Sequence, residues 1–158
     1  MKKLIIFSLL FAFTTKLYAE FYIESTITGI IENEGYQLPN GNQFLMIKGT
    51  YQWTNNIGYY GTATCKGLLE KEGSISSINY LCEAINQKGD KQYILSKRKS
   101  ADLQSGAGKQ IVVDATGNDK IFIGTECNFA ISYLKNNAFA KTKCPVSKEI
   151  YNEYKNNL

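Results

Sequence analysis

The sequence predicts an all-β fold: an eight-stranded antiparallel up-and-down barrel with two disulfide-stapled hairpins and a short C-terminal helix. Two observations indicate this class. Short segments of alternating apolar and polar residues recur along the chain, separated by turns rich in Gly, Asn and Asp. Four cysteines fall into two pairs of equal spacing. Short turns between neighbouring strands suit a closed barrel, which has no exposed edges, and a two-sheet β-sandwich is the main alternative.

Residues 1–19 have the three-part pattern of an export signal peptide. Lys2 and Lys3 form a basic start, the run Leu4–Phe13 is apolar apart from one serine, and the small residue Ala19 suits a cleavage site. The apolar run is too short to span a bilayer as a helix. We therefore expect a mature chain of residues 20–158, one domain without a stable membrane span, in the bacterial periplasm or secreted from the cell.

The charge of the mature chain gives no reason to expect a nucleic-acid partner. The full chain has 18 basic and 14 acidic residues, and three of the lysines belong to residues 1–19. Without them the two signs nearly balance, whereas nucleic-acid binding depends on clustered positive charge. The only basic run is Lys97-Arg98-Lys99, which we interpret as the solvated end of a strand.

The strands are predicted from period-two alternation between turn signals, with longer loops at Glu32–Asn42 and Lys99–Gly108. Their expected ranges are about Phe21–Ile31, Gln43–Trp53, Tyr59–Leu69, Ile75–Asn86, Lys91–Arg98, Lys109–Ala115, Lys120–Leu134 and Asn137–Cys144. After Pro145 the spacing changes: Ile150, Tyr151 and Tyr154 recur as on one face of a helix, and Ser147 can cap it. We expect a helix over 147–156 that packs across one end of the sheet.

The spacing of the cysteines favours one of the three possible connectivities. Gly73-Ser74 lies midway between Cys65 and Cys82 and suits a two-residue type II′ hairpin turn. Pairing outward from that turn places the two cysteines opposite each other in a non-hydrogen-bonded pair, where the Cα atoms are close enough for a disulfide.

Lys135-Asn136 lies midway between Cys127 and Cys144, and pairing outward from a turn there places these two cysteines opposite each other. Each bridge would close a loop worth about 3 kcal/mol in the chain-entropy model, and export supplies the oxidising compartment that such bridges need. A zinc site would need closely spaced cysteines or histidines. The chain has neither, so we predict disulfides and no metal.

The stretch Gly49–Leu134 resembles the glycine-punctuated barrels of allene oxide cyclase-like and dirigent-like proteins. The motifs that carry the resemblance are Gly106-Ala107-Gly108-Lys109, Thr116-Gly117-Asn118-Asp119-Lys120 and Ile123-Gly124. It implies a barrel, but not a catalytic site, because Gln110 and Asp119 stand where an aromatic residue and a second Gly are more typical.

The chain is also similar to small secreted bacterial proteins of unknown activity. The shared positions are Trp53, Gly58, Tyr60-Gly61, Cys65, Cys82-Glu83, Gly89-Asp90 and the Cys127–Cys144 hairpin.

Residue content argues against most catalytic mechanisms. The chain has no histidine, which removes the commonest general base and the usual nucleophile triads. Bridged cysteines offer no thiol, and Gly106-Ala107-Gly108-Lys109 lacks the spacing of a phosphate-binding loop. Glu24, Glu83 and Glu126 lie mid-strand, and Glu83 and Glu126 face solvent if the bridges face inward, so solvated strand positions are favoured over catalytic acids. We therefore predict no catalytic residues and no cofactor, with a cyclase or isomerase of the allene oxide cyclase type as the enzymatic alternative.

The aromatic residues favour a binding role inside the barrel. An eight-stranded barrel either fills its interior with side chains or holds one small molecule. The candidate interior residues are Leu45, Ile47, Tyr51, Trp53 and Tyr80, and the loop Glu32–Asn42 would form the mouth. Two partners remain open: a small apolar molecule in the interior, or an envelope protein bound by loops and outer face, as an inhibitor would be. An empty apolar cavity above about 300 Å³ would favour the first, and a barrel packed solid would leave the outer surface.

Overall fold

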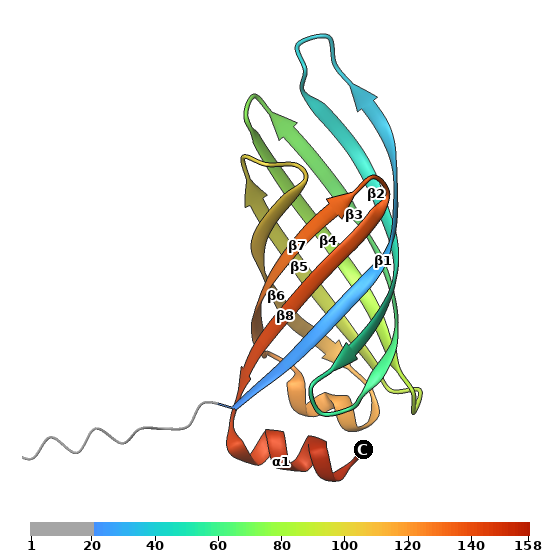
Figure 1. Cartoon of the computed structure of the whole chain (residues 1–158), viewed down its shortest axis with the longest axis vertical. Helices are drawn as coiled ribbons and strands as arrows, with labels where there is room; N and C mark the ends of the chain where they lie inside the picture. The colour runs from blue at the N-terminus through green and yellow to red at the C-terminus, as the bar shows by residue number, and fades with distance from the viewer. Residues whose placement is uncertain (1–20) are drawn as a thin grey trace, which may run out of the picture.

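The computed structural model describes residues 21–158, so the predicted signal peptide, residues 1–19, lies outside the described residues. Strands β1 to β8 form one closed antiparallel barrel in which each strand pairs with its sequence neighbours and β8 pairs with β1. The predicted all-β barrel class is confirmed, and the sandwich alternative is wrong. Figure 1 shows the helical segments together at one end, here called the lower end, whereas the other, upper end carries only hairpins.

Six of the eight strands are longer than the sequence pattern predicts, β4 has the predicted bounds, and β7 is shorter. Their bounds are β1 Phe21–Gln37, β2 Gln43–Asn55, β3 Tyr60–Glu72, β4 Ile75–Asn86, β5 Lys91–Ser100, β6 Ser105–Ala115, β7 Glu126–Leu134 and β8 Asn137–Val146. A 3₁₀-helix, η1 (Gly117–Phe122), follows β6, and an α-helix, α1 (Lys148–Asn156), ends the chain. The predicted helix is confirmed: Ser147 is its N-cap, and the Ser147 side chain accepts a hydrogen bond from the backbone N–H of Ile150.

Both predicted disulfides are present. Cys65 lies opposite Cys82 in the β3–β4 register, with Glu72 opposite Ile75 at the turn, as the centred Gly73-Ser74 turn requires. The second bridge joins Cys127 to Cys144, and the Cα atoms are 4.0 Å apart in the first bridge and 4.2 Å in the second. These short separations are typical of non-hydrogen-bonded antiparallel pairs. The described chain has no free cysteine, and such bridges are typical of proteins in an oxidising environment.

Three predicted boundaries are wrong. The loop Glu32–Asn42 is mostly strand, because β1 continues to Gln37 and only residues 38–42 turn the chain. The loop Lys99–Gly108 shrinks to residues 101–104 between β5 and β6. The strand predicted from Lys120 begins only at Glu126, because η1 occupies the preceding segment. The end of β1 is exposed, so its sequence lacks the apolar alternation that indicates a strand. In η1, Phe122 is buried as a strand residue would be, so the sequence pattern does not distinguish the two.

Helix α1 closes the lower end through an aromatic cluster. Tyr154 stacks on Tyr59 with ring centroids 4.0 Å apart, and Phe122 of η1 meets Tyr154 edge-on at 4.7 Å. The Tyr59 hydroxyl donates to the carbonyl oxygens of Asn157 (2.6 Å) and Tyr154 (3.2 Å). Because all three rings are at most 5% exposed, this end of the barrel is sealed by packed side chains.

Inside the barrel, large aromatic residues lie opposite glycines of the neighbouring strand. The cross-strand pairs are Trp53 with Gly61, Tyr51 with Gly29, Tyr80 with Gly67, and Phe129 with Gly108. A Cβ atom added at Gly108 would lie 2.7 Å from the Phe129 ring. Because glycine has no side chain, each aromatic ring occupies the space that a side chain on the neighbouring strand would otherwise fill.

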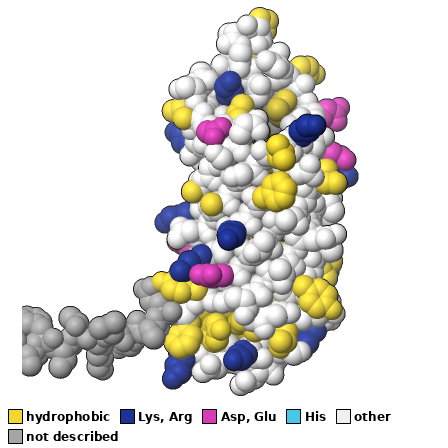
Figure 2. All heavy atoms as spheres, viewed as in Figure 1, with side chains coloured by type: hydrophobic (Ala, Val, Ile, Leu, Met, Phe, Trp, Pro, Cys, Tyr) yellow, Lys and Arg dark blue, Asp and Glu magenta, His cyan; other side chains and the backbone are white. Residues whose placement is uncertain are grey.

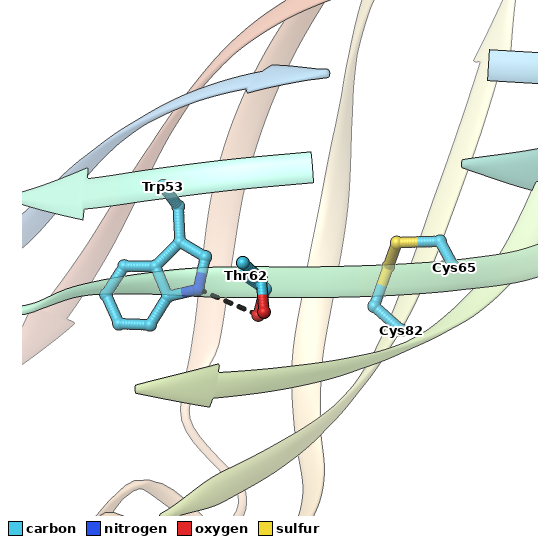
Figure 3. The surroundings of a disulfide bond; sticks show 4 residues. All are labelled: Trp53, Thr62, Cys65 and Cys82. Atoms are coloured by element: carbon cyan, nitrogen blue, oxygen red, sulfur yellow. Dashed lines mark hydrogen bonds between the residues drawn. A yellow bond between two sulfur atoms is a disulfide. The ribbon is translucent and has the colours of Figure 1, made fainter. Parts of the chain in front are cut away.

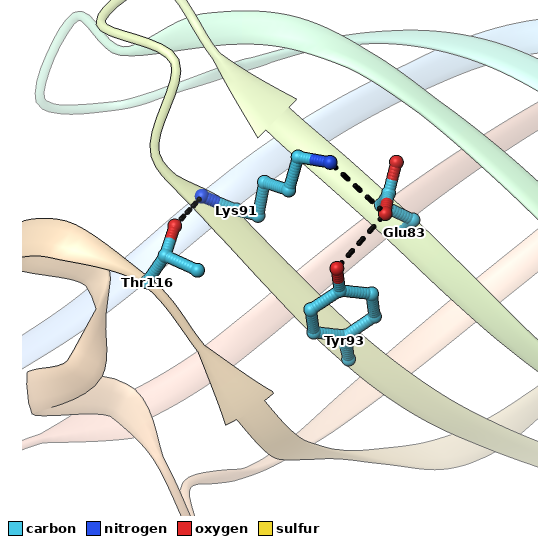
Figure 4. A network of polar contacts seen from close by, with 4 residues as sticks. All are labelled: Glu83, Lys91, Tyr93 and Thr116. Atoms are coloured by element: carbon cyan, nitrogen blue, oxygen red, sulfur yellow. Dashed lines mark hydrogen bonds and ion pairs between the residues drawn. The ribbon is translucent and has the colours of Figure 1, made fainter.

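The outer face carries the acids that the sequence analysis assigned to solvent. Glu24 is paired with Lys143 at 3.2 Å, and Glu126 is exposed. Glu83 accepts hydrogen bonds from the Tyr93 hydroxyl (3.0 Å) and the Lys91 ammonium (3.3 Å), which lower the pKa of its carboxyl (Figure 4). The Thr116 hydroxyl accepts a hydrogen bond from the Lys91 backbone N–H, which joins the start of η1 to the start of β5.

No helix among residues 21–158 is long and apolar enough to cross a membrane.

The glycine–aromatic packing predicts that Gly108→Val destabilises the protein. The new side chain would collide with the Phe129 ring and the Lys97 carbonyl, and such overpacking should lower the free energy of unfolding by about 2–3 kcal/mol. Urea denaturation measures this change. Ala107→Val, at the exposed neighbouring position of the same strand, is the control and should change stability by less than about 0.5 kcal/mol. Equal stabilities of the two variants would contradict the packing argument.

Candidate ligand cavity

The barrel interior contains a lower, apolar cavity of about 120 Å³. Both disulfides lie in its wall, together with side chains from all eight strands and Tyr154 of α1. Its apolar members include Ile23, Ile27, Ile94, Val112 and Ile131. The volume is below the size at which pockets for small organic ligands begin, near 300 Å³. By itself, this lower cavity is too small for such a ligand.

The upper half of the interior contains a larger cavity of about 460 Å³. Its wall is mixed: Ile31, Leu45, Ile47, Leu69 and Ile78 are apolar. The polar members are Asn33, Gln37, Gln43 and Gln104, and the rest of the wall consists of Gly35, Leu103, Tyr133 and Lys135. The hairpins that supply these residues end at the upper end, which no helix covers in Figure 1. The upper cavity therefore has the volume of a ligand pocket and lies toward the open end.

The five predicted interior residues all face the inside, but the structure divides them between the two cavities. Leu45 and Ile47 line the upper cavity, whereas Tyr51, Trp53 and Tyr80 line the lower one. The predicted mouth at Glu32–Asn42 is corrected: Asn33, Gly35 and Gln37 belong to β1 and form part of the cavity wall.

Trp53 is held against β3 near the first disulfide. Its indole N–H donates to the Thr62 carbonyl at 3.2 Å, and the Cys65–Cys82 bridge lies further along β3 (Figure 3). Because the only polar atom of the indole is already bonded, Trp53 presents apolar surface to the cavity.

Three tyrosines meet at the level between the cavities. Burial raises the pKa of Tyr51, Tyr80 and Tyr133, and the proximity of the phenols to one another raises those of Tyr51 and Tyr80 further. All three side chains therefore stay protonated at neutral pH. Protonated phenols are hydrogen-bond donors, and they cannot act as bases in that state.

The three tyrosines and Arg98, the charged residue beside them, are here called the middle layer. The Arg98 side chain is 3% exposed, and the guanidinium carbon lies 5.6 Å from the centre of the Tyr133 ring. Nη2 donates to the Leu103 carbonyl at 3.3 Å and, more weakly, to the Asp102 carbonyl at 3.5 Å. Nε and Nη1 have no hydrogen-bond partner among the described residues. Arg98 thus points inward, and the prediction that the whole run Lys97-Arg98-Lys99 is solvated is wrong for its central residue.

Sequence reasoning missed both Arg98 and Tyr133, although the signal for Arg98 was present. Alternation along β5 places Ser96 and Arg98 on the buried side and leaves Lys97 and Lys99 exposed. Applying the period of two through the basic run would have turned Arg98 inward.

Neither cavity wall contains an aspartate or glutamate side chain. Across residues 21–158 no group of acidic or cysteine side chains is arranged to hold a metal ion. The polar groups around the middle layer include a guanidinium, three protonated phenols and the Ser96 hydroxyl, which donates to the Tyr80 oxygen. All of them can donate hydrogen bonds, and the hydroxyls can also accept. Such a set can bind an anionic or strongly accepting group, but it offers no base.

Asp119 is the buried acid at the lower end. Its side chain is 2% exposed, Oδ2 accepts a hydrogen bond from the Asn86 amide at 3.3 Å, and Oδ1 has no partner. The pKa of Asp119 is raised to about 6, because burial and the Asp90 charge together outweigh the opposing hydrogen bonds from Gln92 and Asn86. Tyr59 and Tyr154 lie close enough to Asp119 for its charge to raise their own pKa values.

These features define a class, a small disulfide-stapled β-barrel with a partly filled interior. Comparison with known proteins does not narrow it further, because the chain matches no protein-family model and no curated protein.

The environment of Asp119 predicts that the protein becomes more stable as the pH falls from 7 to 5. The folded state holds the Asp119 proton up to about pH 6, whereas an unfolded aspartate releases it near pH 4. The folded state therefore binds more protons in this window, and ionised Asp119 costs on the order of 2 kcal/mol at pH 7.5. Asp119→Asn should remove this cost, so the variant should be more stable than the native protein at pH 7.5 and match it near pH 4.

Urea denaturation at several pH values measures this difference. Asp114→Asn, an exposed acid on β6, is the control and should follow the native profile. A variant at position 119 that is less stable at pH 7.5, or that keeps the native pH profile, would contradict the assignment.

Proposed function

We propose that this protein is an exported, non-catalytic binding protein that holds one small amphipathic molecule in the upper cavity of its barrel. The observation that carries the proposal is the upper cavity itself. Its volume of about 460 Å³ falls within the range of small-molecule pockets, and its wall combines apolar side chains with a few polar groups. The lower end is sealed by α1 and the Tyr59–Tyr154 stack, so the ligand enters from the hairpin end.

Binding is favoured over the cyclase or isomerase alternative by the chemistry of the cavity walls. Proton transfer to or from a substrate needs a group poised near the working pH. The raised pKa values of Tyr51 and Tyr80 keep these phenols protonated, and no carboxylate faces either cavity among the described residues. The interior can therefore orient and stabilise a ligand through donors without turning it over.

A neutral fluorescent probe tests the proposal directly. N-phenyl-1-naphthylamine brightens in apolar surroundings and carries no charge. We expect the purified mature protein to bind it with micromolar affinity, and Ile47→Trp, which fills the upper cavity, to weaken binding at least tenfold. Met46→Trp adds the same side chain at the exposed neighbouring position and should leave the affinity unchanged.

The alternative of a protein-binding module draws on an apolar patch outside the barrel. Tyr36, Leu38, Phe44 and Met46 are exposed around the β1–β2 hairpin, and apolar side chains appear on the upper part of the face in Figure 2. Exposed apolar clusters of this kind often contact partner proteins. If the native protein fails to bind the neutral probe, the interior proposal is wrong and this patch becomes the better candidate.

Export predicts a defined N-terminus. The disulfides fit an oxidising compartment, and the signal pattern predicts cleavage after Ala19. The intact mass of protein recovered from the periplasm or medium should correspond to residues 20–158 with two disulfides. Recovery of the full-length chain from the cytoplasm with four free thiols would contradict export.

A further inference from the structure

We infer that Arg98 is the anchor for an anionic headgroup, so that the ligand of the upper cavity is an aliphatic acid whose carboxylate meets the guanidinium. This inference rests on the proposed binding function and adds the chemical class of the ligand. It starts from the burial of Arg98, which is in neither cavity wall itself but contacts residues of the upper one. Leu103 and Tyr133, which contact its guanidinium, line the upper cavity, whereas Ser96 on the same face of β5 lines the lower one.

Among residues 21–158 no carboxylate forms an ion pair with the buried Arg98. Removing a cation from water costs several kcal/mol unless an anion and hydrogen bonds replace the lost hydration. Here two backbone carbonyls and the face of Tyr133 interact with the guanidinium, and Nε and Nη1 are left without acceptors. Asp102 is exposed, and its carboxylate accepts from the Ser105 hydroxyl and the Gln104 N–H. These hydrogen bonds lower the pKa of Asp102, and the Arg98 charge contributes to that shift without forming an ion pair. Nε and Nη1 are fully buried, so the guanidinium must turn toward the upper cavity to meet a ligand carboxylate, which would then supply the missing charge and acceptors together.

The surroundings of Arg98 select for an anion. Tyr80 and Tyr133 lie close enough for the guanidinium charge to act on their phenols, and both remain protonated donors at neutral pH. The only charged side chain in the upper cavity wall is Lys135, at the β7–β8 turn, and it has the same sign as Arg98. Positive potential along the entry route attracts anions and disfavours cations.

The volumes place the tail in the upper cavity. The lower cavity, at about 120 Å³, is too small for a chain of many carbons, whereas the upper one offers about 460 Å³. With the carboxylate at Arg98, an alkyl chain would run toward the open end along Ile78, Leu69, Ile47 and Leu45. The inferred ligand is therefore a medium-chain aliphatic monocarboxylate.

Displacement of N-phenyl-1-naphthylamine by dodecanoate and by 1-dodecanol tests the inference. The two ligands share a tail and differ in charge. We expect the native protein to bind dodecanoate at least tenfold more tightly than dodecanol, and Arg98→Met to abolish that preference by weakening dodecanoate alone. Lys97→Met, the exposed neighbour, removes the same net charge and should keep the preference. Arg98→Lys should retain part of it.

The outcomes separate this inference from the proposed function. Equal affinities of dodecanoate and dodecanol for the native protein, with the probe still bound, would overturn the anion site and leave the pocket intact. Failure of the native protein to bind the probe or either ligand would overturn both. If Arg98→Met does not fold, the thermal shift of the native protein decides: dodecanoate should raise the melting temperature more than dodecanol at equal concentration, and equal shifts would overturn the inference.

Discussion

The antiparallel pairing of β1 with β8 closes the sheet, and the properties of the interior depend on that closure. Ile27 lies opposite Ala140 of β8 and Trp53 of β2, so each inward residue has neighbours on both sides around the ring. A barrel of eight strands encloses only enough room for side chains or one small molecule. The sizes of the inward residues therefore decide whether space remains. Glycines opposite the large aromatic residues let the rings lie against the wall, which preserves a cavity above them.

The strand pairing was predictable because independent local signals agree. The equal cysteine spacings and the turns centred between them specify the same two registers, and the alternation along the strands specifies which face is buried. A slip of one residue would move Cys65 or Cys82 to the outer face and break the bridge. The helix 148–156 was equally accessible, because the change of period after Pro145 and the capping Ser147 indicate one boundary.

The site was less predictable, because it depends on the directions of side chains and on residues whose sequence neighbours suggest a different environment. Arg98 lies between two exposed lysines, and the run resembles a solvated strand end until the alternation is followed through it. The cavity volumes depend on how rings fold: the Tyr51 ring lies over Gly29 and Gly49, which no sequence pattern specifies. The strand prediction before β7 was wrong because Phe122 is apolar like a buried strand residue, and the sequence does not show that it packs in the lower-end cluster.

The disulfides and the buried arginine are linked through the order of the strands. One bridge joins β3 to β4 and the other joins β7 to β8, so β5 and β6, which carry Arg98 and its facing Gly108, lie between two stapled hairpins. Each bridge stabilises the fold by about 3 kcal/mol in the chain-entropy model. The cost of an unpaired buried cation is of similar size. A barrel with two such bridges can therefore keep Arg98 in its interior without a ligand, beside the cavity that we propose to hold a carboxylate.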